Sequence, residues 1–357
     1  MRLILTAALL ASAAVLPAYA HETAASVAQS EPVAKEDLLK PPADAVRYVV
    51  VSEAGQHGSQ WQWQLPDGRT AYRWSQELRG WITEMDQVTT FAPGGTIAAT
   101  TVRGVTMSGD AAEDYRVANG RATWKTATDV GEAAAGGWYI PAGGVGIANA
   151  PLINALAAAG DEGLDFLPSG KGRMTFDAMQ TIQGPGGPRK VQLAFVSGIL
   201  PSPYPVWLDE NKRYFADISF ISVIPAGYDG ALKQLRDAQE AATAAAVAGV
   251  AKRFLSPAAK APVLFDNVQL FDADKGTFLA NRAVLARDGK IAAIGAAGSL
   301  TAPSGAQVID GAGKTLVPGI WDSHLHIGDD WSVLSNVANG ITSFRSPGTT
   351  FDRAVDA

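Results

Sequence analysis

Runs of alternating apolar and polar residues, joined by strong turn signals, occupy residues 46–224 and constrain the fold more than any other feature. Trp61 and Trp63 alternate with polar residues before a Pro-Asp-Gly turn at 66–68. Asn119-Gly120 separates two further runs, and this dipeptide is typical of two-residue hairpin turns. Because one side of each run is polar, the pattern predicts an antiparallel sheet with one face on a core. We therefore expect a mainly β (α+β) chain.

A short apolar helix is expected against this sheet. Residues 150–159 (APLINALAAA) form an apolar run that ends at Gly160, a common helix terminator. The segment VWLDENKRYFADIS (206–219) resembles the half-barrel domains of periplasmic lipid- and lipoprotein-handling proteins. That resemblance implies one β-rich N-terminal domain, residues 44–228, built on a curved antiparallel sheet.

The aromatic residues of this region allow two interpretations. They could line a cavity for an apolar ligand, or they could be ordinary core. The residues concerned are Trp61, Trp63, Trp74, Trp81 and Trp124. His57, in the loop AGQHGSQ, has no evident partner in the sequence, and we expect it to be a solvated loop histidine.

Composition excludes several classes of function. The 357 residues carry a net charge of −6 and no cysteine. Without a basic block, nucleic acid is not an expected partner. Without cysteine, disulfides, thiolate metal sites and cysteine nucleophiles are excluded, which leaves His, Asp, Glu and Lys for metal chemistry. The sequence does not predict an oligomeric state.

The first twenty residues have the pattern of an export signal. Arg2 precedes an apolar stretch, and Ala18-Tyr19-Ala20 forms a small-x-small cleavage site, so we expect cleavage after Ala20. The alternative is a membrane anchor, but the apolar stretch is shorter than the roughly 20 residues of a span. We expect no stable membrane span, a flexible leader over 21–43, and a periplasmic or secreted product.

The C-terminal third changes pattern twice. Residues 229–261 are Ala-rich with apolar residues at helical spacing, which predicts a linker helix closed near Pro257. Residues 262–317 again alternate as short strands, with an Asp288-Gly289 turn, which predicts a small β-sandwich part. Residues 318–357 follow directly.

Two histidines one residue apart stand at the start of this last segment, in LVPGIWDSHLH (316–326). Alternate residues of a strand point to one face, so His324 and His326 can aim two imidazoles at one point. Neutral imidazole is a frequent zinc ligand, and the pair would form half of a metal site. Asp322 could orient an imidazole as a second-shell partner, or it could cap the local backbone.

The order of strands, the DGKIAAIG turn and VIDGAGKTLVPGIWDSHLH resemble the N-terminal part of the amidohydrolase superfamily, with NGITSFRSPG closest to its imidazolonepropionase-like and prolidase-like branches. The resemblance implies a β-sandwich before a (β/α)₈ barrel, with His324 and His326 as ligands of a divalent metal, for which zinc is the expected ion. It also implies metal-activated water attacking a carbon–nitrogen bond of a small amide, cyclic amide or dipeptide-like substrate. Residues 318–357 would then supply the first two barrel units.

The sequence lacks most of the apparatus that the resemblance implies. The family adds a carboxylated Lys or a Glu, two later histidines and an Asp that acts as general base, but no histidine follows His326. A barrel of this type needs about 250 residues. We therefore expect an N-terminal portion with an incomplete barrel and metal site, inactive alone. It could be a truncated copy, a chain completed by a second polypeptide, or a true short product.

The rival hypothesis is a periplasmic binding protein whose half-barrel holds an apolar ligand.

Overall fold

The computed structural model describes residues 33–254, 261–327 and 330–347. The expected signal peptide and its cleavage site at Ala20 lie outside the described residues. The chain is mainly β, as expected, and its largest sheet has ten strands in the order β16-β1-β2-β3-β4-β5-β7-β8-β9, with β6 paired to β5. Its strands are β1 (Val46–Ser52), β2 (Gly55–Gln64), β3 (Thr70–Leu78), β4 (Trp81–Phe91), β5 (Ile97–Thr106), β6 (Gly109–Asp110), β7 (Glu113–Ala118), β8 (Arg121–Thr126), β9 (Val130–Ala134) and β16 (Ser222–Pro225).

Tight turns connect consecutive strands of this sheet where the sequence predicts them. Between β7 and β8, Asn119 and Gly120 have φ angles of 51° and 75°, the conformation of a type I′ hairpin turn. Arg79 and Gly80 form the same kind of turn between β3 and β4, with φ angles of 55° and 80°. The predicted hairpins and antiparallel pairing are therefore confirmed.

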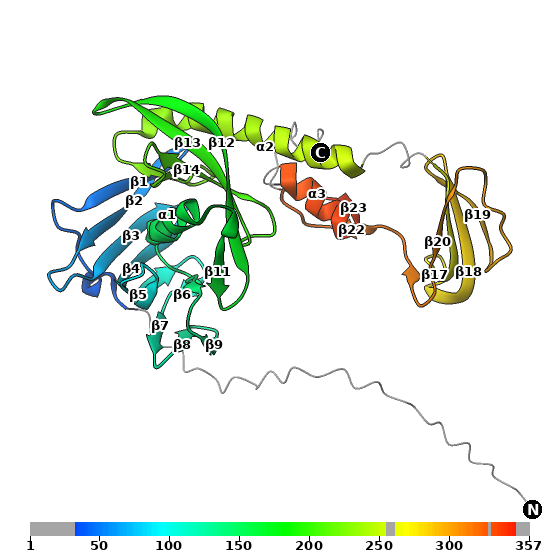
Figure 1. The fold of residues 1–357 in the computed structure, drawn as a ribbon, viewed down its shortest axis with the longest axis horizontal. Helices are drawn as coiled ribbons and strands as arrows, with labels where there is room; N and C mark the ends of the chain where they lie inside the picture. The colour runs from blue at the N-terminus through cyan, green and yellow to red at the C-terminus, as the bar shows by residue number, and fades with distance from the viewer. Residues whose placement is uncertain (1–32, 255–260, 328–329, 348–357) are drawn as a thin grey trace, which may run out of the picture.

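A second sheet of six strands lies against the first and has the order β10-β11-β12-β13-β14-β15. Its strands are β10 (Trp138–Tyr139), β11 (Leu164–Leu167), β12 (Lys171–Gly184), β13 (Gly187–Ser197), β14 (Tyr204–Asp209) and β15 (Tyr214–Ala216). A bridge between Asp217 and Val223 joins it to β16. Together the sheets curl around α1 (Ala150–Ala159), as Figure 1 shows, which confirms a half-barrel arrangement.

Helix α1 fills the concave side of the sheets. Its Leu152, Ile153 and Leu156 are at most 3% exposed, and they pack with residues of both sheets, such as Tyr115 of the first and Phe166 of the second. The helix ends at Gly160, with a φ of 58°, so the predicted helix has the predicted bounds. Short 3-10 helices precede and follow it at Gly146–Asn149 and Gly160–Glu162.

Three buried polar side chains on the inner face of the large sheet hold the loop that leads into α1. Gln60 and Gln87 accept the backbone N–H groups of Ile147 and Val145, each at 2.9 Å. The Glu113 carboxylate accepts the Ala142 N–H at 3.0 Å and the Tyr139 hydroxyl at 2.6 Å. We call these three residues, Gln60, Gln87 and Glu113, the polar ladder. Burial raises the pKa of Glu113 despite the hydrogen bonds that favour its charged form.

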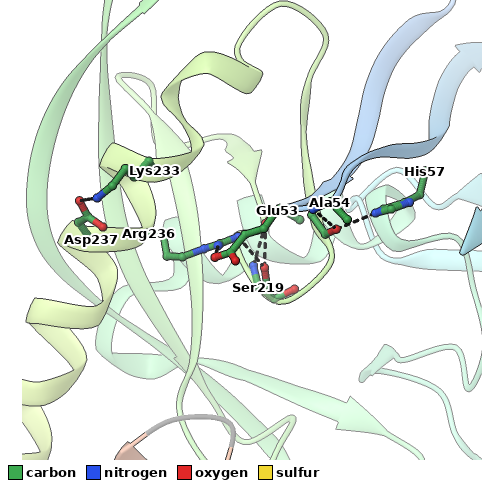
Figure 2. Close-up of polar contacts among 9 residues, drawn as sticks. Glu53, Ala54, His57, Ser219, Lys233, Arg236 and Asp237 are labelled. Atoms are coloured by element: carbon green, nitrogen blue, oxygen red, sulfur yellow. Dashed lines mark hydrogen bonds and ion pairs between the residues drawn. The ribbon is translucent and has the colours of Figure 1, made fainter. Parts of the chain in front are cut away.

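Helix α2 (Leu232–Phe254) follows a short 3-10 helix at Asp229–Ala231 and docks on the N-terminal domain through its first half. Leu235 is fully buried there. Gln239 accepts the Trp207 indole N–H at 3.2 Å and donates to the Ile218 carbonyl at 2.8 Å. Arg236 pairs with Glu53 in the β1–β2 turn at 2.7 Å (Figure 2). The described part of the chain contains no helix long and apolar enough to cross a membrane.

The region expected as a β-sandwich forms one hydrogen-bonded sheet of five strands, in which β17 pairs with β18, β20 and β21. Its strands are β17 (Val263–Asp272), β18 (Thr277–Arg287), β19 (Lys290–Ala296), β20 (Gln307–Asp310) and β21 (Thr315–Leu316). The last elements are β22 (Ile320–Asp322), α3 (Asp330–Ala338) and β23 (Ile341–Phe344). These elements form one β–α–β unit where the sequence predicts the start of a barrel, and the barrel itself stays a prediction. Helix α3 packs against α2.

The Asp217 carboxyl lies where the two large sheets meet and should make the stability of the fold depend on pH. Its Oδ2 accepts the Tyr204 hydroxyl, whereas its Oδ1 is buried without a hydrogen-bond partner in the described structure. Burial raises the pKa of Asp217 from 3.8 to about 7. The native state therefore holds a proton that the unfolded chain releases between these values, and stability is lost as pH rises from about 4 to about 7.

Asp217→Asn should remove most of this loss, because the amide cannot ionise. The part of the loss that falls between pH 5 and pH 8 is about 3 kcal/mol by linkage. The measurement is urea unfolding at pH 5 and pH 8, with the exposed Asp274→Asn as the matched control. If Asp217→Asn lost as much stability between the two pH values as the parent does, the assignment to Asp217 would be wrong.

Candidate metal centre

The two candidate histidines follow a strand that is anchored to its neighbour. β22 pairs in parallel with β23, with Ile320 opposite Ile341 and Asp322 opposite Phe344. Beyond β22, the Leu325 N–H donates to the Arg345 carbonyl at 3.0 Å, and the Arg345 N–H donates to the Asp322 carbonyl at 2.8 Å. The two histidines lie in this loop. These bonds hold the loop at the carboxyl ends of β22 and β23.

His324 and His326 lie in that loop rather than in the strand, which ends at Asp322. Their Nε2 atoms are nevertheless 3.1 Å apart, and their ring centroids are 5.1 Å apart. Both side chains are exposed, whereas Leu325 between them is half-buried and Ile327 is 6% exposed. The alternation expected of a strand thus continues through the loop and brings the imidazoles to one side.

Asp322 contacts the backbone of this loop. Its Oδ1 accepts the His324 N–H at 2.9 Å, which is the contact that the capping alternative predicts. The bond closes the turn between the strand end and the first histidine, so the carboxylate shapes the loop from which the imidazoles project. Its role as a second-shell partner of an imidazole stays a prediction.

The spacing of the two nitrogens matches that of neighbouring ligands on zinc. With Zn–N distances of about 2.0–2.1 Å and tetrahedral angles, two such ligands stand about 3.3 Å apart, close to the observed 3.1 Å. Among the described residues, however, no group of three or more His, Cys, Asp or Glu side chains could hold a metal ion. A catalytic zinc normally has three protein ligands and a water, so the described residues fit half of such a site and not the whole.

His57 has a partner that the sequence analysis missed. Its Nε2 lies 2.7 Å from the Ser52 Oγ, which also accepts the Ala54 N–H at 3.1 Å (Figure 2). The expectation of an unpartnered histidine is therefore wrong, because the β1–β2 hairpin turns between the two residues and brings them together. A spacing of five residues across a two-residue hairpin loop was the signal available in the sequence. The pair stabilises the turn that also carries Glu53.

The tryptophans of the N-terminal domain do not line one cavity. Trp74 and Trp124 pack against separate core clusters, whereas Trp81 is 57% exposed. Trp61 lines a cleft on the outer face of the large sheet. Because α1 packs into the concave side, the rival hypothesis of an apolar ligand inside the half-barrel gains no better support than the metal-site hypothesis.

Comparison with solved structures gives partial likenesses, among them two prolidases. No family model matches the chain, and no curated protein matches it. A putative prolidase from Bifidobacterium longum is similar over 27% of this chain and 26% of its own, with 22% identity and a TM-score of 0.24. A prolidase complexed with N-methylphosphonate-L-proline is similar over 27% of this chain and 28% of its own, with 21% identity and a TM-score of 0.22. The likeness therefore spans about a quarter of each of these proteins.

Gly319, just before β22, should be essential for the strand pairing that positions the histidines. A Cβ at this position would lie 2.1 Å from Thr342 Oγ1 and 2.5 Å from its Cγ2. Gly319→Ala should therefore separate β22 from β23, at a cost of about 1–3 kcal/mol, and speed hydrogen exchange at the Ile320 amide, which donates to Gly340. Adding Thr342→Ala removes the two nearest atoms and leaves only the Thr342 Cβ, at 2.8 Å, so it should restore part of the protection. Equal exchange in Gly319→Ala and the parent would contradict this account.

Proposed function

We propose that this chain is the N-terminal portion of an exported metal-dependent amidohydrolase, in which His324 and His326 supply two ligands of a divalent metal, most simply zinc. The observation that carries the proposal is the 3.1 Å separation of the two Nε2 atoms at the carboxyl end of β22. Parallel pairing of β22 with β23 across α3 supports it, since barrel enzymes collect their chemistry at the carboxyl ends of such strands.

The proposed reaction is hydrolysis of a carbon–nitrogen bond in a small amide, a cyclic amide or a dipeptide-like compound. A divalent metal held there supplies Lewis-acid activation of water or of the substrate carbonyl. His324 and His326 would hold the metal through their imidazoles, and Asp322 together with the end of β23 fixes the loop that carries them. The described residues offer no third donor to this pair, so we propose that the chain alone binds metal without turning over substrate.

Metal binding by this chain should depend on both histidines. We expect equilibrium dialysis against Zn²⁺ to show one zinc ion bound per chain. A chelator should remove this ion readily, because two protein ligands hold zinc weakly. His324→Ala and His326→Ala should each weaken binding at least about tenfold, since each leaves a single imidazole. His57→Ala is the matched control and should bind as the parent does.

Two results would contradict the proposal or its scope. Zinc binding that survives both His324→Ala and His326→Ala would exclude the pair as the metal site. Zinc retained through extended dialysis against chelator would show that additional donors complete the site, and the claim of a half-site would then fail.

A further inference from the structure

The outer face of the large sheet carries a cleft that is separate from the histidine pair. Residues 33–45, which we call the N-terminal strap, run across strands β2 to β5 on the face opposite the polar ladder. The strap includes a 3-10 helix at Lys35–Asp37. Leu38 of the strap is 3% exposed, and the Leu39 N–H donates to Asp86 Oδ2 at 2.7 Å. The described part of the expected leader is thus held in place on the sheet.

Two cationic side chains at the strap share one carboxylate. The Glu84 carboxylate pairs with both Lys35, at 2.6 Å, and the buried Arg73, and it accepts the Ser75 hydroxyl at 2.8 Å. Burial alone would raise the pKa of Glu84, but these three partners outweigh it and lower the pKa. One carboxylate therefore serves two cations. Asp86 is already paired with Arg103 through Nε–Oδ1 at 3.0 Å.

The strap and the sheet enclose a cleft of about 390 Å³. Its walls combine apolar surface with cationic side chains. The lining residues are Lys35, Glu36, Leu38, Leu39, Lys40, Pro41, Trp61, Arg73 and Ser75. Lys40 is exposed at the rim, and no carboxylate of the described residues lies within ion-pair distance of it. The volume is at the small end of the range for small-molecule sites, about 300–1,000 Å³.

We propose that this cleft binds a small amphipathic anion, in which a carboxylate or sulfonate group is joined to an aromatic or short apolar body. The anionic group would lie near Lys40 and the cationic end of the Lys35–Glu84–Arg73 cluster. The body would lie against Trp61, Leu39 and Pro41. Charge complementarity favours an anion over a cation. The three cationic side chains of the lining face two carboxylates, Glu36 and the Glu84 that Lys35 and Arg73 share, which leaves one positive charge in excess. The small volume decides against a long lipid chain.

The test uses two probes that differ in their charge. 8-Anilino-1-naphthalenesulfonate carries a sulfonate, and N-phenyl-1-naphthylamine has the same ring system without it. In fluorescence titrations of the full chain we expect Lys40→Glu to weaken binding of the sulfonate about tenfold, since reversal replaces an attraction by a repulsion. Lys40→Ala should weaken it about threefold to fivefold. Neither change should alter binding of the uncharged probe more than about twofold.

Matched controls distinguish binding of the probes in the cleft from their non-specific binding to apolar surface elsewhere. Lys125→Glu reverses an exposed charge on β8, away from the cleft lining, and should leave sulfonate binding within about twofold of the parent. Trp61→Ala should weaken both probes, because it removes the apolar wall. The proposal is overturned if the parent does not bind the sulfonate, if Lys40→Glu and Lys125→Glu act equally, or if Trp61→Ala changes neither probe.

Discussion

The polar ladder of Gln60, Gln87 and Glu113 is the interaction on which the N-terminal domain depends. It supplies acceptors for the backbone N–H groups of residues 142–147 inside a region that α1 shields from water. A buried N–H group without an acceptor costs about 1–3 kcal/mol, so the loop could not lie there against an apolar sheet face. Since the loop sets where α1 begins, the ladder determines that the concave side is filled by a helix and not left open for a ligand.

Elements whose signals are local could be predicted from the sequence, and contacts between distant residues could not. The Asn119-Gly120 hairpin and helix α1 each depend on residues within about ten positions of one another. The Gln87–Val145 bond spans 58 positions and the Leu39–Asp86 bond spans 47. Both Gln87 and Asp86 read as ordinary polar residues of a strand, because alternation shows that side chains share a face but not what covers that face.

In the candidate metal site, too, local features could be predicted from the sequence and contacts between distant residues could not. The spacing of His324 and His326 predicts that their imidazoles converge, and they do. The expected reason, strand alternation, is incomplete, because the strand ends at Asp322. Convergence depends instead on the Asp322 carboxylate and on the bond from Leu325 to Arg345, a residue that follows β23 and lies twenty positions later in the chain. A third ligand could not be assigned from the sequence, and none joins the pair in the described residues.

Helix α2 contacts both the half-barrel and the unit that carries the histidine pair. Its first half is fixed to the domain by buried Leu235 and by the Gln239 hydrogen bonds to Trp207 and Ile218. A helix of 23 residues extends about 34 Å at 1.5 Å per residue, and α3, which lies between β22 and β23, packs against it. The helix that docks on the N-terminal domain thus also contacts the helix between β22 and β23. Because the strap and its cleft lie on the outer face of the large sheet, a ligand there could bind without contacting the histidines.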